Sequence, residues 1–269
     1  MTTSRETIQA ALLAAKDMMD HPWRGRPGGG REHGSPFIAK EKKGAQKEED
    51  ILSPDFELFR HFYDLSGGIV RLVDIAPEQP GGYAFAEKAS QLCTVSIAHT
   101  TADYDQAKAA FDKGVTHATH LFNAMSGLHH RKPGVVGAVF DDSRVRGELI
   151  CDGFHIHLRC CGPPSGCWGT GRSSSATPCG PTACRKGSPL TWEADGYRHE
   201  GKATLAARHP GRVCFQPASG SKKPGFLRHP LCPSGEGCHA DPRQAIGMEE
   251  EIGSIVPGKR ADWLCWMSI

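Results

Sequence analysis

Histidines gather in the stretch 115–134, which reads VTHATHLFNAMSGLHHRKPG and holds four of the chain's 14 histidines. Its first half is typical of a β-strand, because apolar residues alternate there with β-favouring threonines. Its second half, from Asn123 on, has the composition of a turn. Polar side chains at a point where a strand passes into a loop indicate a site, because loops on a rigid scaffold often carry function.

Three predicted strands end in the same way, each close to a histidine. These are 93–98 with His99, 115–121 with His120, and 146–151 with His155. Predicted helices alternate with the strands, which is typical of parallel βαβ units. In a (β/α)8 barrel, the C-terminal ends of the strands carry the active-site residues. The sequence therefore predicts an α/β fold of the TIM-barrel type, with a site at one end of the sheet.

Imidazoles from two adjacent strands, together with a carboxylate, would form an open divalent-metal site. Such a site lowers the pKa of bound water to roughly 7 and polarises a carbonyl group. Arg131 could bind an anion such as phosphate in bidentate fashion, although arginine beside Lys-Pro-Gly also occurs on ordinary surface loops. His117 is expected on the other face of its strand, without a metal. His129 and His130 lie in a predicted loop, where one could touch a substrate and at least one is expected to be exposed.

Composition excludes several classes of protein. A chain of 269 residues allows one large domain or two small ones. A net charge of +2 does not favour a nucleic-acid or membrane surface. Because no apolar run approaches about 18 residues and no leader is recognised, a soluble cytoplasmic protein is expected.

The chain also carries six longer motifs, which are SPFIAKEKKGAQ (35–46), SIAHTTADY (96–104), THLFNAM (119–125), HHRKPG (129–134), ELICDGFHIH (148–157) and AIGMEEEIGSIVPGKRAD (245–262). Together they resemble the N-acetylglucosamine-6-phosphate deacetylase family of the amidohydrolase superfamily. The resemblance runs almost unbroken from residue 35 to residue 157. It implies a metal-dependent hydrolase that converts N-acetylglucosamine 6-phosphate to glucosamine 6-phosphate and acetate in amino-sugar catabolism.

The resemblance also implies the residues that bind the metal. In the family a divalent ion, expected here to be Zn²⁺, is held by two strand-end histidines, which correspond to His99 and His120. A glutamate in a His-x-Glu-Gly-Pro-Phe motif is the third ligand. The chain reads EHGS at 32–35 instead, so Glu32 is the nearest candidate but is out of register.

The substrate-binding residues follow from the same resemblance. Asn123 and Ala124 correspond to the pair that holds the sugar phosphate, and Arg131 corresponds to the phosphate-binding arginine. His155 corresponds to the catalytic histidine that contacts the substrate and helps to polarise the acetyl carbonyl. The expected partner is a small phosphosugar, and relatives tend to form homodimers.

The chain departs from the family after His157. The Ser-Asp-Ser motif that carries the general-base aspartate is absent there, and residues 158–244 show neither helical nor strand periodicity. Eight of the 11 cysteines fall in this segment, which are Cys160, Cys161, Cys167, Cys179, Cys184, Cys214, Cys232 and Cys238. When residues 173–180 are back-translated with freely chosen third bases, a one-base shift of the reading frame can give a sequence that contains Ser-Asp-Ser. We therefore expect single-base slips in the underlying gene or in its read.

Three regions are predicted on this basis. Residues 1–157 form a partial amidohydrolase barrel that carries the site. Residues 158–244 are an out-of-frame-looking segment rich in Cys, Gly and Pro, in which 158–240 are predicted to be irregular, and residues 245–269 are a C-terminal remnant of barrel and sandwich. The family's N-terminal β-sandwich and first barrel strands are expected to be missing.

Several alternatives remain open. The chain could be a catalytically inactive, truncated and frameshifted remnant, or a fragment that only binds a sugar phosphate. Residues 158–240 could form a Cys/His-rich metal-binding module, but the irregular cysteine spacing disfavours it. The substrate could also differ within the superfamily, although Arg131 and the Asn123-Ala124 pair favour a phosphosugar over a cyclic amide.

Overall fold

The computed structural model describes residues 2–21, 35–150 and 155–157. Backbone strands are also described at 31–33, 172–174, 189–190, 196–199 and 202–205, with single residues at 247, 248, 250, 251, 257 and 259. The predicted regions 158–244 and 245–269 therefore lie almost entirely outside the described residues.

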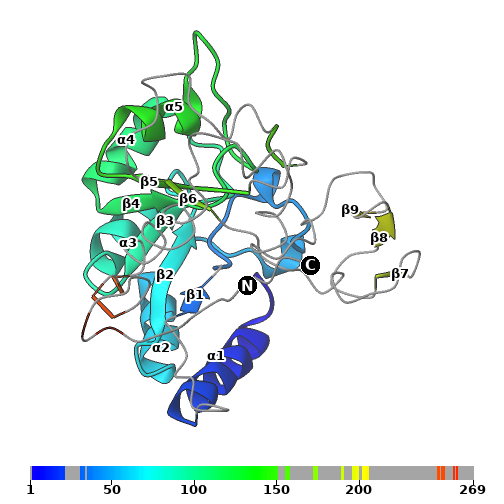
Figure 1. Ribbon diagram of the computed structural model, residues 1–269, viewed down its shortest axis with the longest axis vertical. Coiled ribbons are helices and arrows are strands. Elements are labelled where there is room, and N and C mark those ends of the chain that lie inside the picture. Colours follow the sequence, from blue (N-terminus) through cyan, green and yellow to red (C-terminus); the bar gives the residue numbers. More distant parts are fainter. Residues whose placement is uncertain are drawn as a thin grey trace.

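A six-stranded parallel sheet forms the centre of the structure, with its strands in the order β1-β2-β3-β4-β5-β6 (Figure 1). The strands are β1 (Arg31–His33), β2 (Val70–Ile75), β3 (Thr94–Ile97), β4 (Val115–Ala118), β5 (Arg146–Leu149) and β6 (Arg172–Ser174). Sequential parallel neighbours, joined by helices from β1 to β5, are the arrangement of an incomplete (β/α)8 barrel.

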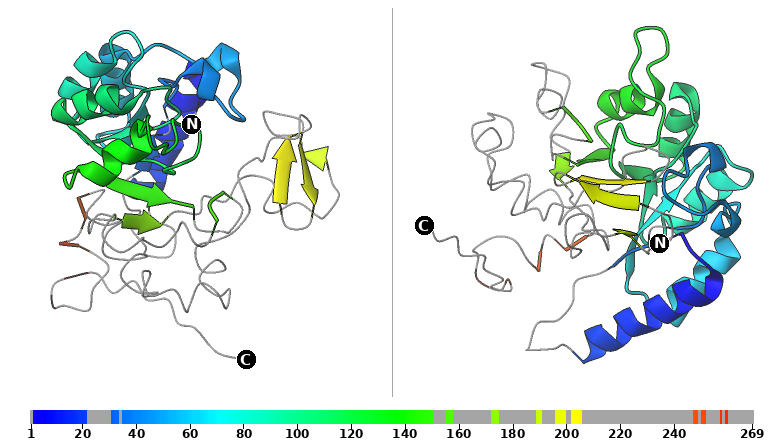
Figure 2. Two further views of the ribbon diagram at one scale, coloured as in Figure 1. Left: turned by 90° about the horizontal axis from the view of Figure 1, so that it is seen from above. Right: turned by 90° about the vertical axis from the view of Figure 1, so that its right-hand side faces the viewer.

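Helices cover the sheet and connect its strands (Figures 1 and 2). They are α1 (Arg5–Asp20), α2 (Phe56–Leu65), α3 (Gly82–Ala89), α4 (Tyr104–Asp112) and α5 (Gly134–Asp141), with short 3₁₀ turns η2 (Lys40–Lys42) and η3 (Glu48–Asp50). The core between α2, α3 and the sheet is aromatic. The ring centroid of Phe85 lies 5.1 Å from that of Phe37 and 5.4 Å from that of Phe59.

The first helix, α1, begins at Arg5. Its N-cap is Ser4, whose Oγ accepts from the N–H of Thr7 at 3.3 Å. Serine is a stronger N-cap than threonine, and its oxygen reaches the free N–H three residues on. Two apolar residues of this helix, Ile8 and Leu12, are buried.

Helix α5 was not predicted, because its sequence GVVGAVFD is rich in glycine and β-branched valine. It forms because six of its eight residues are buried, from Gly134 to Val139. Gly134 itself has φ +62, and a Cβ there would lie 2.7 Å from the carbonyl oxygens of Ser126 and Gly127. Tertiary burial thus overrides low helix propensity.

Short strands also occur within 158–240, which was expected to be irregular. Strand β6 extends the central sheet, and β7 (Pro189–Leu190), β8 (Gly196–His199) and β9 (Lys202–Leu205) form an antiparallel three-stranded sheet. Backbone groups can form such ladders without side-chain periodicity, because every residue except proline carries one donor and one acceptor.

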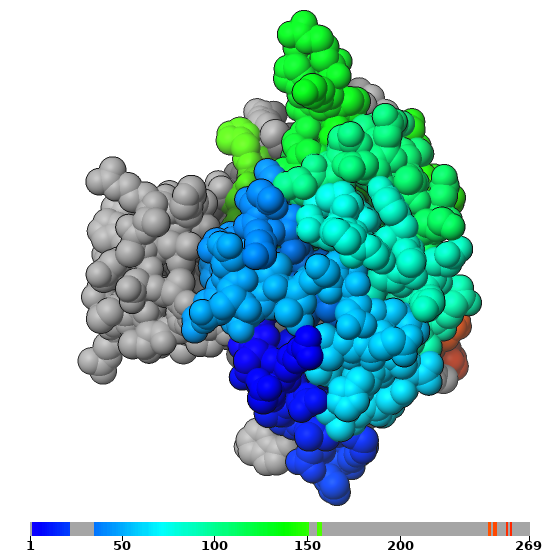
Figure 3. Space-filling view, turned by 180° about the vertical axis from the view of Figure 1, so that it is seen from behind, coloured from blue at the N-terminus to red at the C-terminus, as the bar shows by residue number. Residues whose placement is uncertain are grey.

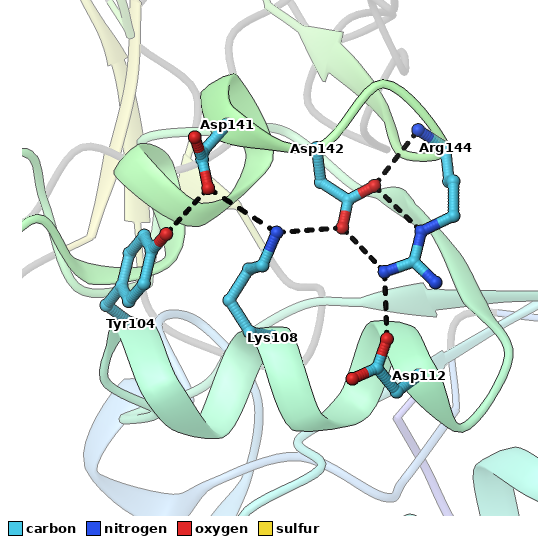
Figure 4. Close-up of polar contacts among 6 residues, drawn as sticks. All are labelled: Tyr104, Lys108, Asp112, Asp141, Asp142 and Arg144. Atoms are coloured by element: carbon cyan, nitrogen blue, oxygen red, sulfur yellow. Dashed lines mark hydrogen bonds and ion pairs between the residues drawn. The ribbon is translucent and has the colours of Figure 1, made fainter.

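A polar network joins α4 to the turn after α5 (Figure 4). Asp142 is 6% exposed and accepts from Arg144 at 2.8 and 2.9 Å and from Nζ of Lys108 at 3.0 Å. The exposed Asp141 accepts from the hydroxyl of Tyr104 at 2.7 Å. The hydrogen bonds from Arg144, with those from Lys108, hold the pKa of Asp142 far below its ordinary value.

Substitution Asp142→Asn should lower the free energy of unfolding at pH 7 by about 1–3 kcal/mol, because charge-assisted hydrogen bonds contribute about that much. The pKa of Asp142 is lower in the folded than in the unfolded state. Its contribution is therefore present above pH ~4 and is lost as the pH falls further. Urea unfolding followed by circular dichroism at pH 7 and pH 3 should show the difference between variant and wild type shrinking in acid.

The matched control is Asp141→Asn, which removes an exposed carboxylate from the same network and should cost less than about 1 kcal/mol. An equal loss for Asp142→Asn at both pH values would contradict the assigned role of its charge.

Candidate active site

His99 and His120 meet at the C-terminal edge of the sheet. Each lies two residues beyond its strand, His99 after β3 and His120 after β4. Because Ile97 and Ala118 are paired in register, the two histidines emerge side by side. Their Nε2 atoms are 3.0 Å apart and their ring centroids 4.7 Å apart. The structure therefore brings together two of the predicted metal ligands.

Backbone conformation at this edge is strained. His99 and His120 have φ +45 and +40, and Phe122 and Ala124 have φ +78 and +53. A non-glycine residue in this region costs of order 1–3 kcal/mol, and such residues cluster at functional sites. Among the described residues, these four non-glycine positions with positive φ lie at His99 and in the segment 120–124 that follows β4.

The segment that follows β1 orients the ring of His99. The carbonyl oxygen of Lys42 accepts from Nδ1 of His99 at 2.7 Å, and the N–H of Ala39 donates to the carbonyl oxygen of His99 at 2.9 Å. A carbonyl can only accept, so Nδ1 of His99 carries the proton and Nε2 presents a lone pair toward His120. This is the tautomer of a histidine that binds a metal through Nε2.

The separation of His99 and His120 fits that of two ligands of one divalent metal ion. Two imidazole nitrogens that bind one zinc ion at 2.0–2.1 Å with tetrahedral geometry lie about 3.3 Å apart, close to the separation found here. In the described part of the chain, no third Cys, His, Asp or Glu completes a metal-binding group. Glu32 lies in β1, where its backbone is level with Leu72 and Thr94, five residues before His99.

The predicted phosphate-binding turn is attached to both histidines. The side-chain amide of Asn123 donates to the carbonyl oxygens of His120 and Leu121 at 3.2 and 3.4 Å. The carbonyl oxygen of Ala124 accepts from the N–H of Thr100, the residue after His99, at 3.1 Å. These bonds hold Asn123 and Ala124 beside the histidine pair.

Residues 127–132 are exposed and form part of a loop that projects from the body of the molecule (Figure 3). Arg131 is in this loop. Its backbone N–H donates to Nδ1 of His129 at 3.3 Å, and His129 pairs with Lys132 in a short antiparallel bridge. The rings of His129 and His130 lie 4.2 Å apart, and both residues are exposed. The expectation that at least one of these histidines is exposed is confirmed.

His155 lies in a bend after β5, the strand next to β4, and is half-buried. It thus follows the same edge of the sheet as His99 and His120. Its contact with a substrate stays a prediction.

His117 belongs to a buried polar group that the sequence did not predict. It is 1% exposed, and its Nδ1 lies 3.0 Å from Oγ of Ser96. Burial, and secondarily the charge of Arg146, lower the pKa of His117 to about 4. A neutral imidazole held by a serine supports the structural role expected for this histidine. The only signal in the sequence was a polar residue at an interior position of each strand, Ser96 in β3 and His117 in β4.

Part of this chain is similar in sequence to curated sugar-phosphate deacetylases. No family model matches. Over 123 residues the chain is 39% identical to the N-acetylglucosamine-6-phosphate deacetylase of Lysinibacillus sphaericus, which covers 45% of this chain and 32% of the relative. It is 35% identical over 170 residues to the N-acetylgalactosamine-6-phosphate deacetylase of Escherichia coli O157:H7, which covers 60% and 44%. The chain is a partial homologue of these deacetylases.

Solved deacetylase structures have the same fold. The enzyme from Pasteurella multocida superposes with a TM-score of 0.86 at 25% identity, covering 97% of this chain and 68% of that one. A variant of the Mycobacterium smegmatis deacetylase in complex with N-acetyl-D-glucosamine-6-phosphate gives the same TM-score and identity, covering 97% and 69%. The predicted α/β partial barrel is confirmed. The chain spans less than half the length of the curated deacetylases named above.

In the part of the chain that the structure describes, no helix is both long and apolar enough to span a membrane.

The free energy of unfolding should fall by up to about 3 kcal/mol as the pH drops from 6.5 to 4, because of His117. In that window the unfolded chain binds a proton at this histidine and the folded chain does not, so acid favours unfolding. Substitution His117→Asn keeps a donor near the position of Nδ1 but cannot titrate, so it should remove this pH dependence. Urea unfolding in the presence of a chelator measures it.

Substitution His61→Asn, at an exposed histidine on α2, is the matched control and should keep the wild-type pH dependence. If His117→Asn leaves the slope between pH 4 and 6.5 unchanged, the neutral state of His117 is wrong.

Proposed function

We propose that this chain acts as a metal-dependent deacetylase that hydrolyses N-acetylglucosamine 6-phosphate to glucosamine 6-phosphate and acetate. The observation that carries the proposal is the pair of strand-end histidines with Nε2 atoms 3.0 Å apart, oriented by the carbonyl of Lys42. The similarity to N-acetylglucosamine-6-phosphate deacetylases supports the reaction type. A cytoplasmic location is part of the proposal, because a sugar phosphate is charged and does not cross membranes unaided.

His99 and His120 would hold the divalent ion, for which Zn²⁺ is the first candidate because imidazole nitrogens suit it. When bound, such an ion lowers the pKa of water and polarises the acetamide carbonyl. The part of the protein is to hold the two Nε2 atoms 3.0 Å apart, with the proton of His99 kept on Nδ1. The backbone bonds to His99 and the strained turn at His120 do this before the substrate arrives.

The phosphosugar would lie over the turn at Asn123 and Ala124, with Arg131 binding its phosphate. A guanidinium forms two parallel hydrogen bonds with a phosphate, so it supplies both charge and orientation. His155, at the same edge of the sheet, would contact the acetyl group as the catalytic histidine. The solved complex of the Mycobacterium smegmatis deacetylase variant with N-acetyl-D-glucosamine-6-phosphate supports this substrate class.

A second candidate function is a phosphosugar-binding fragment without turnover. The specific observation that favours it is the absence of a Ser-Asp-Ser motif after His157 in the sequence, because loss of a general base commonly costs about 10²–10⁴-fold in rate. A second candidate substrate is N-acetylgalactosamine 6-phosphate, since the matched Escherichia coli O157:H7 protein carries that name. The two sugars differ at one hydroxyl and can be compared directly.

The purified chain, supplied with Zn²⁺, should release acetate from N-acetylglucosamine 6-phosphate. His99→Gln and His120→Gln should each lower the rate by more than about 100-fold and reduce bound zinc, because even outer partners of metal ligands contribute 10–100-fold. Acetate release in a coupled assay and metal content by mass spectrometry are the two measurements. N-acetylgalactosamine 6-phosphate is assayed in parallel.

The exposed His61→Gln variant serves as the control and should match wild type. Saturable binding of the phosphosugar without acetate release would reject the hydrolase and support the binding fragment. Neither binding nor turnover would identify an inactive remnant.

Arg131→Met should raise the dissociation constant for glucosamine 6-phosphate by about 10-fold or more, because a charge-assisted hydrogen bond contributes about 1.5–3 kcal/mol. Binding of unphosphorylated N-acetylglucosamine should not change. Isothermal titration calorimetry measures both, and Lys132→Met, at the exposed neighbour on the same loop, is the control. If the two variants lose affinity equally, Arg131 supplies only general charge.

A further inference from the structure

A row of buried polar side chains crosses three strands beneath the histidine pair. Asp74 on β2, Ser96 on β3 and His117 on β4 are paired in register. Thr119, the first residue after β4, joins them. Their exposed fractions are 6%, 0%, 1% and 4% in the order Asp74, Ser96, His117, Thr119. Buried polar groups persist only when hydrogen-bonded, and these bond to one another.

The hydrogen bonds of this row run in one direction. The hydroxyl of Thr119 donates to Oδ1 of Asp74 at 2.6 Å. A hydroxyl has one proton, so at the 2.7 Å contact with Ser96 the oxygen of Thr119 accepts and the serine donates. The serine oxygen then accepts from Nδ1 of His117 at 3.0 Å. A carboxylate at one end and a neutral imidazole at the other fix every proton between them.

Two residues of this row lie close in sequence to the two candidate metal ligands, His99 and His120. Ser96 precedes His99 by three residues on β3, and Thr119 directly precedes His120 after β4. The contact between the two hydroxyl oxygens therefore ties the two strands together just below the 3.0 Å contact between the imidazoles.

His120 has a strained backbone with φ +40, and hydrogen bonds made by the residues before and after it hold this conformation. After it, the N–H of Leu121 donates to the carbonyl oxygen of Glu148 at 2.7 Å. Before it, the N–H of Thr119 donates to the carbonyl oxygen of Ile97 at 3.2 Å. The side chain of Thr119 adds two hydrogen bonds, of 2.6 Å to Asp74 on β2 and of 2.7 Å to Ser96 on β3.

We propose that Thr119 is a positioning residue for the metal pair, whose hydroxyl, held by Asp74 and Ser96, sets the place of His120 relative to His99. The inference rests on the proposed metal-dependent function. Without the hydroxyl, Asp74 loses a donor, the link between β3 and β4 at this level opens, and the strained turn at His120 relaxes. The two imidazoles then no longer converge on one ion.

The test compares three variants of the full chain. Thr119→Val removes the hydroxyl at nearly constant shape, Thr119→Ser keeps it, and Thr116→Val makes the same change at an exposed position of β4. The affinity for Zn²⁺ is measured by competition with a chromophoric chelator, and the visible absorption of bound Co²⁺ reports the ligand geometry. Thermal unfolding of each metal-free variant confirms that it is folded.

Thr119→Val should bind Zn²⁺ about 10–100-fold more weakly, as outer partners of metal ligands commonly do, and its Co²⁺ spectrum should change. Thr119→Ser should restore both, and Thr116→Val should match wild type. A folded Thr119→Val variant with wild-type zinc affinity and Co²⁺ spectrum would overturn the inference, whatever its melting temperature. A wild-type chain that binds neither ion would instead overturn the proposed function, and the inference with it.

Discussion

Parallel pairing of β2, β3 and β4 places Ile75, Ile97 and Ala118 in one row of the sheet, and the site begins just beyond that row. Backbone hydrogen bonds fix the row, since a slip of one residue would turn every side chain to the opposite face. The same register places a polar row one residue earlier and the two histidines two residues later. The spacing between these layers is therefore a property of the backbone ladder.

The interior beneath the histidines is polar, and this has an energetic consequence. Asp74, Ser96, His117 and Thr119 lie where apolar layers usually fill a barrel. Each hydrogen bond in such a group contributes modestly, but a missing partner leaves a buried polar atom at full desolvation cost. The row therefore tolerates little displacement. The hydrogen bonds of the row thus help to offset the strain energy of the left-handed backbone conformations at His99 and His120, immediately above it.

Similarity to solved deacetylases extends over most of this chain but only about two thirds of theirs. Residues 35–157, whose motifs resemble the deacetylase family, contain both strand-end histidines and the turn at Asn123 and Ala124. These residues are brought together by adjacent βα units, so the geometry of the pair depends on local neighbours. In the proposed function, a third metal ligand and the general base would have to come from strands elsewhere in the barrel. This explains how the pair of proposed metal ligands can be brought together in the described part of the chain without them.

Sequence patterns alone determined the βα rhythm and the position of His99 just after its strand, because strand and helix periods are local. The strand that carries His120 was predicted over 115–121 but ends at Ala118, since His120 has φ +40. Sequence patterns also indicated exposure of at least one of His129 and His130, because loops with turn chemistry lie at the surface. Helix α5 could not be predicted, since its valines and glycines disfavour a helix until the sheet buries them. Nor could the sequence reveal that Lys42 orients His99, or that Thr119 reaches Asp74 across an intervening strand. Those contacts join residues more than 40 positions apart, and only the tertiary register of the parallel sheet decides which of them meet.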